Sequence, residues 1–154
     1  MTSNIVKNGI VIELASERLQ SSGNGFANVE MNKKNGTFPD VYATAHDTIR
    51  HVDYLIGITG RAENKENGDW DPLFNLVRTD ADHERAKSLA VAMNKKPAFV
   101  AIALRKSDNS YAAYFGELDA IGFPRSIPVL PADRLKYRQL VPYAQDKRVA
   151  EFFS

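Results

Sequence analysis

The sequence predicts an α+β protein with a single globular domain, 1–154, and a mixed or antiparallel sheet. Three neighbouring segments support this fold class: an amphipathic segment at 80–94, an unbroken apolar run at 98–104 and an aromatic-rich segment at 111–117. Apolar patterns that change from helical spacing to strand length along one chain are typical of α+β domains. A length of 154 residues is enough for one sizeable hydrophobic core.

The apolar run 98–104 is expected to be the central strand, because continuous apolar runs of this length are typical of strands buried on both faces. Polar residues at 105–110 follow it. The run and the segment 111–117 should therefore pair as a hairpin. Within the second strand, Tyr111 and Phe115 should share one face and Tyr114 should lie on the other, because strand residues alternate.

A helix is expected over 80–94, where it would cover the central strand. Thr79 is a suitable N-cap, and acidic residues occupy the first turn. Its apolar stripe consists of Ala86, Leu89, Ala90 and Met93.

A strand is expected before this helix, at 73–78. A right-handed crossover would make this strand parallel to 98–104, and an antiparallel arrangement stays open.

The N-terminal half contains four more expected elements. Residues 9–14 combine a glycine start with β-branched residues and favour a strand, but Ile5, Val6 and Ile10 also fit an amphipathic helix, so both alternatives stay open. Segments 26–31 and 40–44 should form a hairpin, and 54–59 a further strand. The polar, glycine-containing segment 60–70 is expected to be an exposed loop.

A C-terminal helix is expected over 131–140, with Pro131 in its first turn and Pro142 after its end. The last residues are expected to form a short helix that docks Val149, Phe152 and Phe153.

Composition restricts the possible chemistry. The chain is 44% hydrophobic and 25% charged, carries a formal charge of +1 and contains no cysteine. It therefore has no disulfides, no thiol nucleophile and no zinc–thiolate site. Neither a signal peptide nor an apolar stretch long enough to span a membrane is expected, which favours a soluble, cytoplasmic protein. Nothing in the sequence indicates an oligomeric state.

The C-terminal region is the most basic part of the chain, with six basic and three acidic side chains in 121–154. On the expected helix, Arg134 and Arg138 would be i, i+4 neighbours that repel each other unless an anion offsets their charge. The candidate contact surface for a macromolecular partner, nucleic acid or an acidic protein, consists of Arg125, Arg134, Lys136, Tyr137 and Arg138. The leading interpretation is a non-catalytic binding or adaptor domain without cofactor. Lys95–Lys96 and Arg105–Lys106 would extend the surface if they shared its face.

Pro39-Asp40 followed by Glu63-Asn64-Lys65 resembles the motif of PD-(D/E)xK nucleases. In that family two carboxylates hold a divalent cation, Mg or Mn, and a lysine orients the attacking water or stabilises phosphate charge. The resemblance implies catalytic roles for Asp40, Glu63 and Lys65, with the second carboxylate on a core strand. A divalent-metal-dependent nuclease is therefore the alternative function.

Histidines and carboxylates at 46–53, with His83, form a weaker candidate metal site. His46 and His51 are five residues apart, so they would diverge on a helix rather than share a ligand face. An i, i+4 surface contact between Asp47 and His51 is expected instead, and no metal ligand is assigned.

Overall fold

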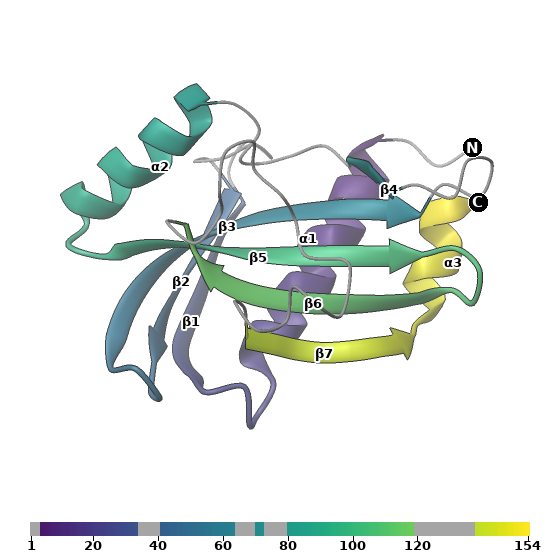
Figure 1. Ribbon diagram of the computed structural model, residues 1–154, viewed down its shortest axis with the longest axis horizontal. Helices are drawn as coiled ribbons and strands as arrows, with labels where there is room; N and C mark the ends of the chain where they lie inside the picture. The colour runs from purple at the N-terminus through teal and green to yellow at the C-terminus, as the bar shows by residue number, and fades with distance from the viewer. Residues whose placement is uncertain (1–3, 34–40, 64–69, 73–79, 119–137) are drawn as a thin grey trace.

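The computed structural model describes residues 4–33, 41–63, 70–72, 80–118 and 138–154 (Figure 1). The α+β fold class is confirmed. The described elements are, in order, α1 (Asn4–Gln20), β1 (Phe26–Lys33), β2 (Val41–Asp47), β3 (Val52–Glu63), β4 (Trp70–Pro72), α2 (Asp80–Ala92), β5 (Lys96–Arg105), β6 (Ser110–Glu117), β7 (Arg138–Gln145) and α3 (Lys147–Phe153).

The strands form one mixed sheet in the order β1-β2-β3-β5-β6-β7, with β4 paired to the far end of β3. Neighbouring strands are antiparallel except for β3 and β5, which are parallel. A parallel pair needs a crossover, and α2 lies between these two strands in the chain. The strand predicted at 73–78 lies outside the described residues, and the parallel partner of β5 is β3.

The central position predicted for 98–104 is confirmed, since β5 lies between β3 and β6 and every residue of this run is buried. The predicted hairpin is also present, with Val100 opposite Phe115 and Leu104 opposite Tyr111. Tyr111 and Phe115 belong to the main core cluster, whereas Tyr114 is buried outside it, as strand alternation predicts.

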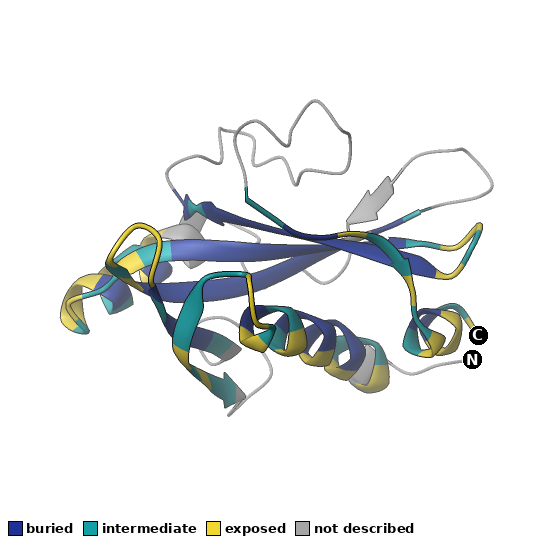
Figure 2. Cartoon of the chain, turned by 90° about the horizontal axis from the view of Figure 1, so that it is seen from below, coloured by how far each residue is buried: buried dark blue, intermediate teal, exposed yellow. Residues whose placement is uncertain are grey.

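The strand expected at 9–14 is wrong, and the helical alternative is confirmed by α1. The helix lies along one face of the sheet, on the same side as α3 (Figure 2), and contacts β1, β3, β5 and β7. Ile10, Val11, Leu14 and Ala15 are at most 5% exposed. Burial of this stripe outweighs the modest preference of β-branched residues for strands.

Helix α2 is confirmed, although it ends two residues before the predicted boundary. Lys95 N donates to the Ala90 carbonyl at 2.8 Å and Asn94 N to the Val91 carbonyl at 3.0 Å, while Asn94 has φ 55°. These bonds form a Schellman motif, which ends a helix through a left-handed residue. The buried residues Ala86 and Ala90 lie on this helix, which contacts β5 and β3.

The extent of β3 also differs from the prediction. The exposed loop expected at 60–70 is wrong for 60–63, because β3 continues to Glu63 beside β5 and β4, and Ala62 is buried. It is also wrong for Trp70, which begins β4, and 64–69 lie outside the described residues. Gly57 pairs with both β2 and β5, and Gly60 pairs with Ile102 of β5, so the strand continues through both glycines.

The helix expected at 131–140 is wrong for residues 138–140, which belong to β7, and 131–137 lie outside the described residues. Pairing with β6 gives these three residues their strand conformation. Pro142 is tolerated because β7 is an edge strand. The short final helix is confirmed: Asp146 caps α3, and Val149 and Phe152 are buried.

Candidate functional site

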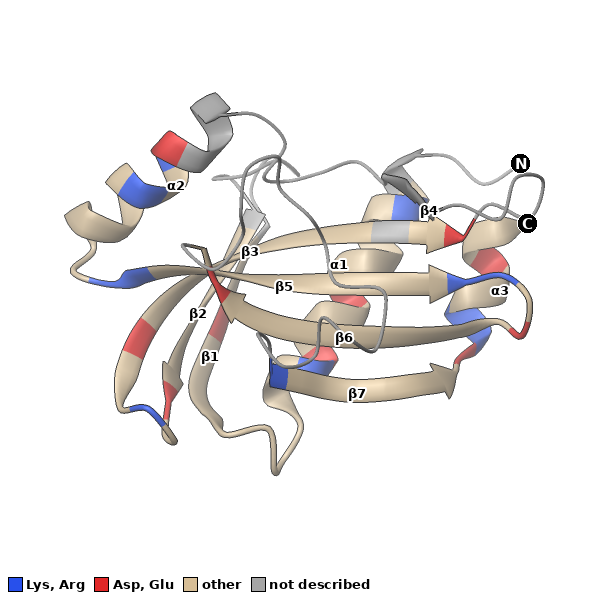
Figure 3. Cartoon of the chain, viewed as in Figure 1, with Lys and Arg blue, Asp and Glu red and all other residues tan. Residues whose placement is uncertain are grey.

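The basic residues identified in the sequence divide between the two ends of the sheet. Lys96 begins β5 opposite Tyr54, and Arg138 begins β7 opposite Phe115, near the end of β6. Arg105 ends β5, and Lys106 follows it in the β5–β6 turn. Figure 3 shows basic residues at both ends of β5. Arg50 and Lys95 lie at the same end as Lys96 and Arg138. We call these four residues, Arg50, Lys95, Lys96 and Arg138, the basic end.

Four of the five predicted contact residues, Arg125, Arg134, Lys136 and Tyr137, lie outside the described residues. The ends of their segment can nevertheless be located. The described chain stops at Leu118, directly after β6, and resumes at Arg138, and both residues lie at the basic end. Arg105 and Lys106 lie at the other end of the sheet and do not extend this surface.

Arg138, the fifth predicted contact residue, has an internal ion pair. Its Nη2 lies 2.6 Å from Oδ2 of Asp47, and its Nη1 lies 3.2 Å from Oδ1. The guanidinium carbon lies 5.1 Å from the Phe26 ring centroid and 5.3 Å from that of Phe115. Only 17% of the side chain is exposed. Arg138 therefore joins the start of β7 to the end of β2.

Asp47 is fully buried, and its carboxylate also accepts hydrogen bonds from the backbone N–H groups of Ile49 and Arg50 at 2.9 and 3.3 Å. Burial acts to raise the pKa of Asp47, but the hydrogen bonds from Arg138 and the backbone outweigh it and lower the pKa. The expected side-chain contact between Asp47 and His51 is wrong. The carboxylate pairs with Arg138, and the bond between His51 and Asp47 runs from the His51 backbone N–H to the Asp47 carbonyl at 2.8 Å.

A second polar cluster lies at the basic end around Glu117, the last residue of β6. Its Oε2 is 2.6 Å from Lys96 Nζ and accepts a hydrogen bond from the Tyr54 hydroxyl at 3.1 Å, while its Oε1 is 3.8 Å from Arg50 Nη1. The hydrogen bond from Lys96 lowers the pKa of Glu117, and burial raises the pKa of Tyr54. No sequence pattern indicated this cluster, because its members come from three separate stretches, 50–54, Lys96 and Glu117.

His46 and Asp53 form a cross-strand pair, with Nδ1 2.9 Å from Oδ1. They line a cavity of about 210 Å³ together with Asn28, Glu30, Thr44, Ala45 and Lys95. The side chain of His83 lies outside the described residues. Within the described part of the chain, no three His, Asp or Glu side chains are grouped as metal ligands.

Of the three residues in the nuclease motif, only Glu63 is described, and Asp40 and Lys65 lie outside the described residues. The Glu63 carboxylate accepts hydrogen bonds from the backbone N–H and the hydroxyl of Ser107, both at 3.2 Å. Tyr42, near the described start of β2, pairs with Gly57 of β3. Gly57 and Glu63 are six residues apart on β3, so their Cα atoms are separated by roughly 20 Å at the usual strand rise.

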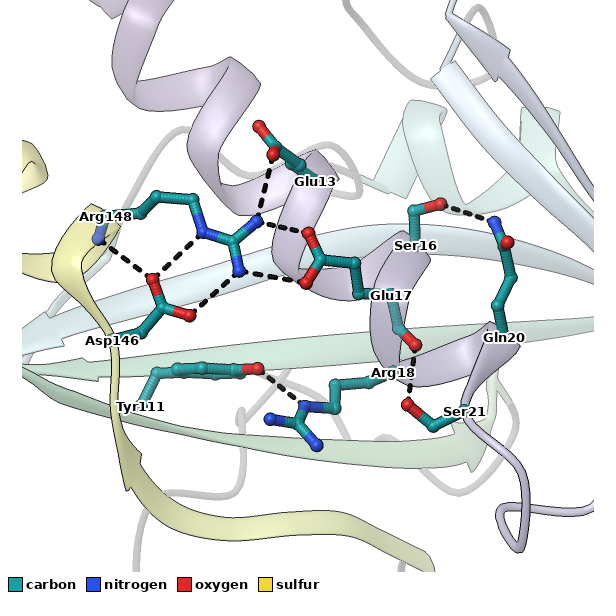
Figure 4. A network of polar contacts seen from close by, with 9 residues as sticks. All are labelled: Glu13, Ser16, Glu17, Arg18, Gln20, Ser21, Tyr111, Asp146 and Arg148. Carbon is teal, nitrogen blue, oxygen red and sulfur yellow. Dashed lines mark hydrogen bonds and ion pairs between the residues drawn. The ribbon is translucent and has the colours of Figure 1, made fainter.

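A third network joins α1 to α3 (Figure 4). Arg148 Nη2 lies 2.8 Å from Oδ2 of Asp146 and 2.9 Å from Oε1 of Glu17, and Nη1 lies 3.0 Å from Glu13. The hydrogen bonds from Arg148 lower the pKa values of Glu17 and Asp146. This network holds the two helices together. Local sequence patterns gave no signal for it, because Glu13 and Glu17 are 135 and 131 residues from Arg148.

No protein-family model and no curated protein matches the sequence. Two crystal structures of the Legionella pneumophila effector protein RavZ align with 86% and 94% of this chain, at 10% and 9% identity. Both alignments have a TM-score of 0.26, and this chain spans 42% of each RavZ chain. Likeness at this level carries no argument about function. None of the described helices is long and apolar enough to cross a membrane.

Proposed function

We propose that this protein is a non-catalytic binding domain that contacts a negatively charged macromolecule, nucleic acid or an acidic protein face, through the basic end. One observation supports the proposal. Arg50, Lys95 and Lys96 lie at the end of the sheet where the described chain stops at Leu118 and resumes at Arg138. The segment between those points contains Arg125, Arg134 and Lys136.

Positive charges gathered at one end attract an anionic partner and increase its rate of association. If the partner is a nucleic acid, each lysine or arginine that meets a phosphate also releases condensed counterions. Tyr137 supplies an aromatic surface on which a base can stack.

Arg138 has a positioning role in this proposal. Its ion pair with Asp47 fixes the start of β7. Two of the predicted contact residues, Lys136 and Tyr137, directly precede Arg138 in the sequence.

A pull-down from cell lysate, with and without nuclease treatment, tests the proposal and separates the two partner classes. The contact variant is Arg134→Gln/Lys136→Gln. The matched control is Lys106→Gln/Lys147→Gln, which removes two exposed positive charges from the opposite end of the sheet. The contact variant should lose the partner and the control should retain it. A nucleic-acid partner disappears with nuclease, whereas an acidic protein survives the treatment. Equal capture by all three proteins would refute the proposal.

A second candidate is a divalent-metal nuclease of PD-(D/E)xK type, and the extent of β3 favours it. Glu63 lies on a strand of the core sheet, as the resemblance implies for the second carboxylate. Its present hydrogen bonds come from Ser107, so a Mg or Mn ion would share or displace them. In this proposal Asp40 is the other metal ligand and Lys65 assists the attack.

Incubation of the purified protein with plasmid DNA and Mg or Mn tests the nuclease hypothesis. Cleavage by the wild type that is lost in both Glu63→Gln and Lys65→Ala would support it. Intact plasmid with both metals, or cleavage that survives both substitutions, would refute it.

A further inference from the structure

The carboxylate of Glu117 is surrounded by the kinds of donor that proteins use to bind phosphate. Lys96 Nζ lies 2.6 Å from it, the Tyr54 hydroxyl 3.1 Å and Arg50 Nη1 3.8 Å. Lysine, arginine and tyrosine side chains all contact phosphate oxygens in nucleic-acid complexes. A carboxylate and a phosphate accept the same charge-assisted hydrogen bonds.

Packing fixes the tyrosine of this cluster before any ligand arrives. Tyr54 is fully buried as a residue, and its ring meets Phe115 edge to face at 5.0 Å between centroids. Its hydroxyl bonds Glu117 and lies 3.5 Å from Arg50 Nη1. Such a donor needs little reorganisation when an anion binds, because its orientation is already set by the core.

The remaining members of the cluster are accessible from solvent. The side chains of Lys96 and Arg50 are 47% and 44% exposed, and that of Glu117 is 28% exposed. Two cations, Lys96 and Arg50, face the Glu117 carboxylate within this cluster. The neighbouring Asp47 carboxylate is balanced by Arg138. The two cations of this cluster can therefore attract an approaching anion.

We propose that Arg50, Tyr54 and Lys96 form a binding site for a phosphate group of a nucleic acid, and that Glu117 occupies this site in the free protein. This inference rests on the proposed function and specifies the partner as nucleic acid. The phosphate displaces the Glu117 carboxylate, which turns toward solvent at the end of β6. Glu117 thus competes with the ligand and lowers the affinity of the basic end.

The test is a fluorescence-anisotropy titration of a 5′-labelled single-stranded oligonucleotide at fixed salt concentration. Glu117→Gln removes the competing charge and keeps an oxygen that can accept from the Tyr54 hydroxyl. We expect it to bind the oligonucleotide about fivefold more tightly than the wild type, at the upper end of what a partly exposed ion pair contributes. Adding Lys96→Gln to Glu117→Gln should reverse the gain. Lys106→Gln, which removes a lysine just beyond the other end of β5, is the matched control and should bind like the wild type.

The outcomes distinguish failure of this site from failure of the proposed function. Equal binding by the wild type, Glu117→Gln and Glu117→Gln/Lys96→Gln would overturn the phosphate site, but binding through the predicted contact residues Arg134 and Lys136 would still be compatible with the proposed function. If neither the wild type nor Glu117→Gln binds the oligonucleotide, both the phosphate site and the nucleic-acid form of the proposed function are refuted. If Glu117→Gln lowers the melting temperature, the single variants Lys96→Gln and Arg50→Gln replace it in the titration. Weaker oligonucleotide binding by these two variants supports the site, and unchanged binding overturns it.

Discussion

Replacement of Arg138 by methionine should destabilise the protein strongly, because it leaves the Asp47 carboxylate buried without its cation. Asp47 is 0% exposed and would retain only the two backbone N–H groups of Ile49 and Arg50. Removing one partner of a buried ion pair costs about 3–5 kcal/mol. Methionine retains an apolar side chain beside Phe26, so most of the loss comes from the charge. The total free energy of unfolding of a domain of this kind is about 5–15 kcal/mol.

Urea unfolding followed by circular dichroism measures this loss, and its pH dependence identifies the cause. In the wild type the pKa of Asp47 is lowered. The pair therefore contributes stability above the unfolded-state pKa, and this contribution is lost as pH falls through the folded-state pKa. Without Arg138, burial raises the pKa of Asp47, and protonation removes the buried charge. The difference between Arg138→Met and the wild type should be largest near neutral pH and shrink toward about pH 4.

A loss of less than about 1 kcal/mol, the level of an exposed ion pair, would refute this account of Arg138. So would a loss of several kcal/mol that does not change with pH, because it would indicate lost packing rather than an unpaired carboxylate. Lys106→Met, at an exposed turn position, is the control. Its free energy of unfolding should lie within about 0.5 kcal/mol of the wild-type value.

Three other substitutions test the fold. Val100→Asp places an unpaired charge in the centre of β5 and should unfold the protein by circular dichroism; unchanged melting would show that the strand is peripheral. Arg148→Met should cost roughly 1 kcal/mol, since Glu17 is half exposed. The loss should disappear in about 1 M salt and as pH falls through the lowered pKa of Glu17; a salt-independent loss would contradict an ionic role. Gly25→Ala should cost about 1–2 kcal/mol in urea unfolding, because Gly25 has φ +88° and a Cβ there would lie 2.7 Å from Ile49 Cδ1; a neutral effect would refute this strain.

The fold class, the central strand and α2 could be predicted because their signals are local. The apolar run 98–104 is long enough to indicate burial on both faces, and the stripe of α2 has helical spacing. The stretch 9–14 was ambiguous, because its β-branched residues fit either a strand or the buried face of a helix. Only its contact with the sheet decides between them.

The polar clusters could not be predicted for a different reason. Asp47 and Arg138 are 91 residues apart, and Tyr54 and Glu117 are 63 apart. A charged side chain in a single sequence gives no sign of its long-range partner. The basic character of 121–154 was visible, but the ion pair of Arg138 with a buried carboxylate became clear only in the folded structure, where the start of β7 meets the end of β2 although three strands separate them in the sheet.

The central claim is that an anionic partner is bound by the basic end together with the predicted contact residues Arg134 and Lys136. The salt dependence of oligonucleotide binding tests this claim most directly. For single strands, the slope of log Kd against log salt is about 0.7 for each phosphate contact. We predict that Arg134→Gln/Lys136→Gln binds more weakly than the wild type and has a slope smaller by up to about 1.4. The control Lys106→Gln/Lys147→Gln should retain the wild-type affinity and slope. Identical affinities and slopes for all three proteins would contradict the claim.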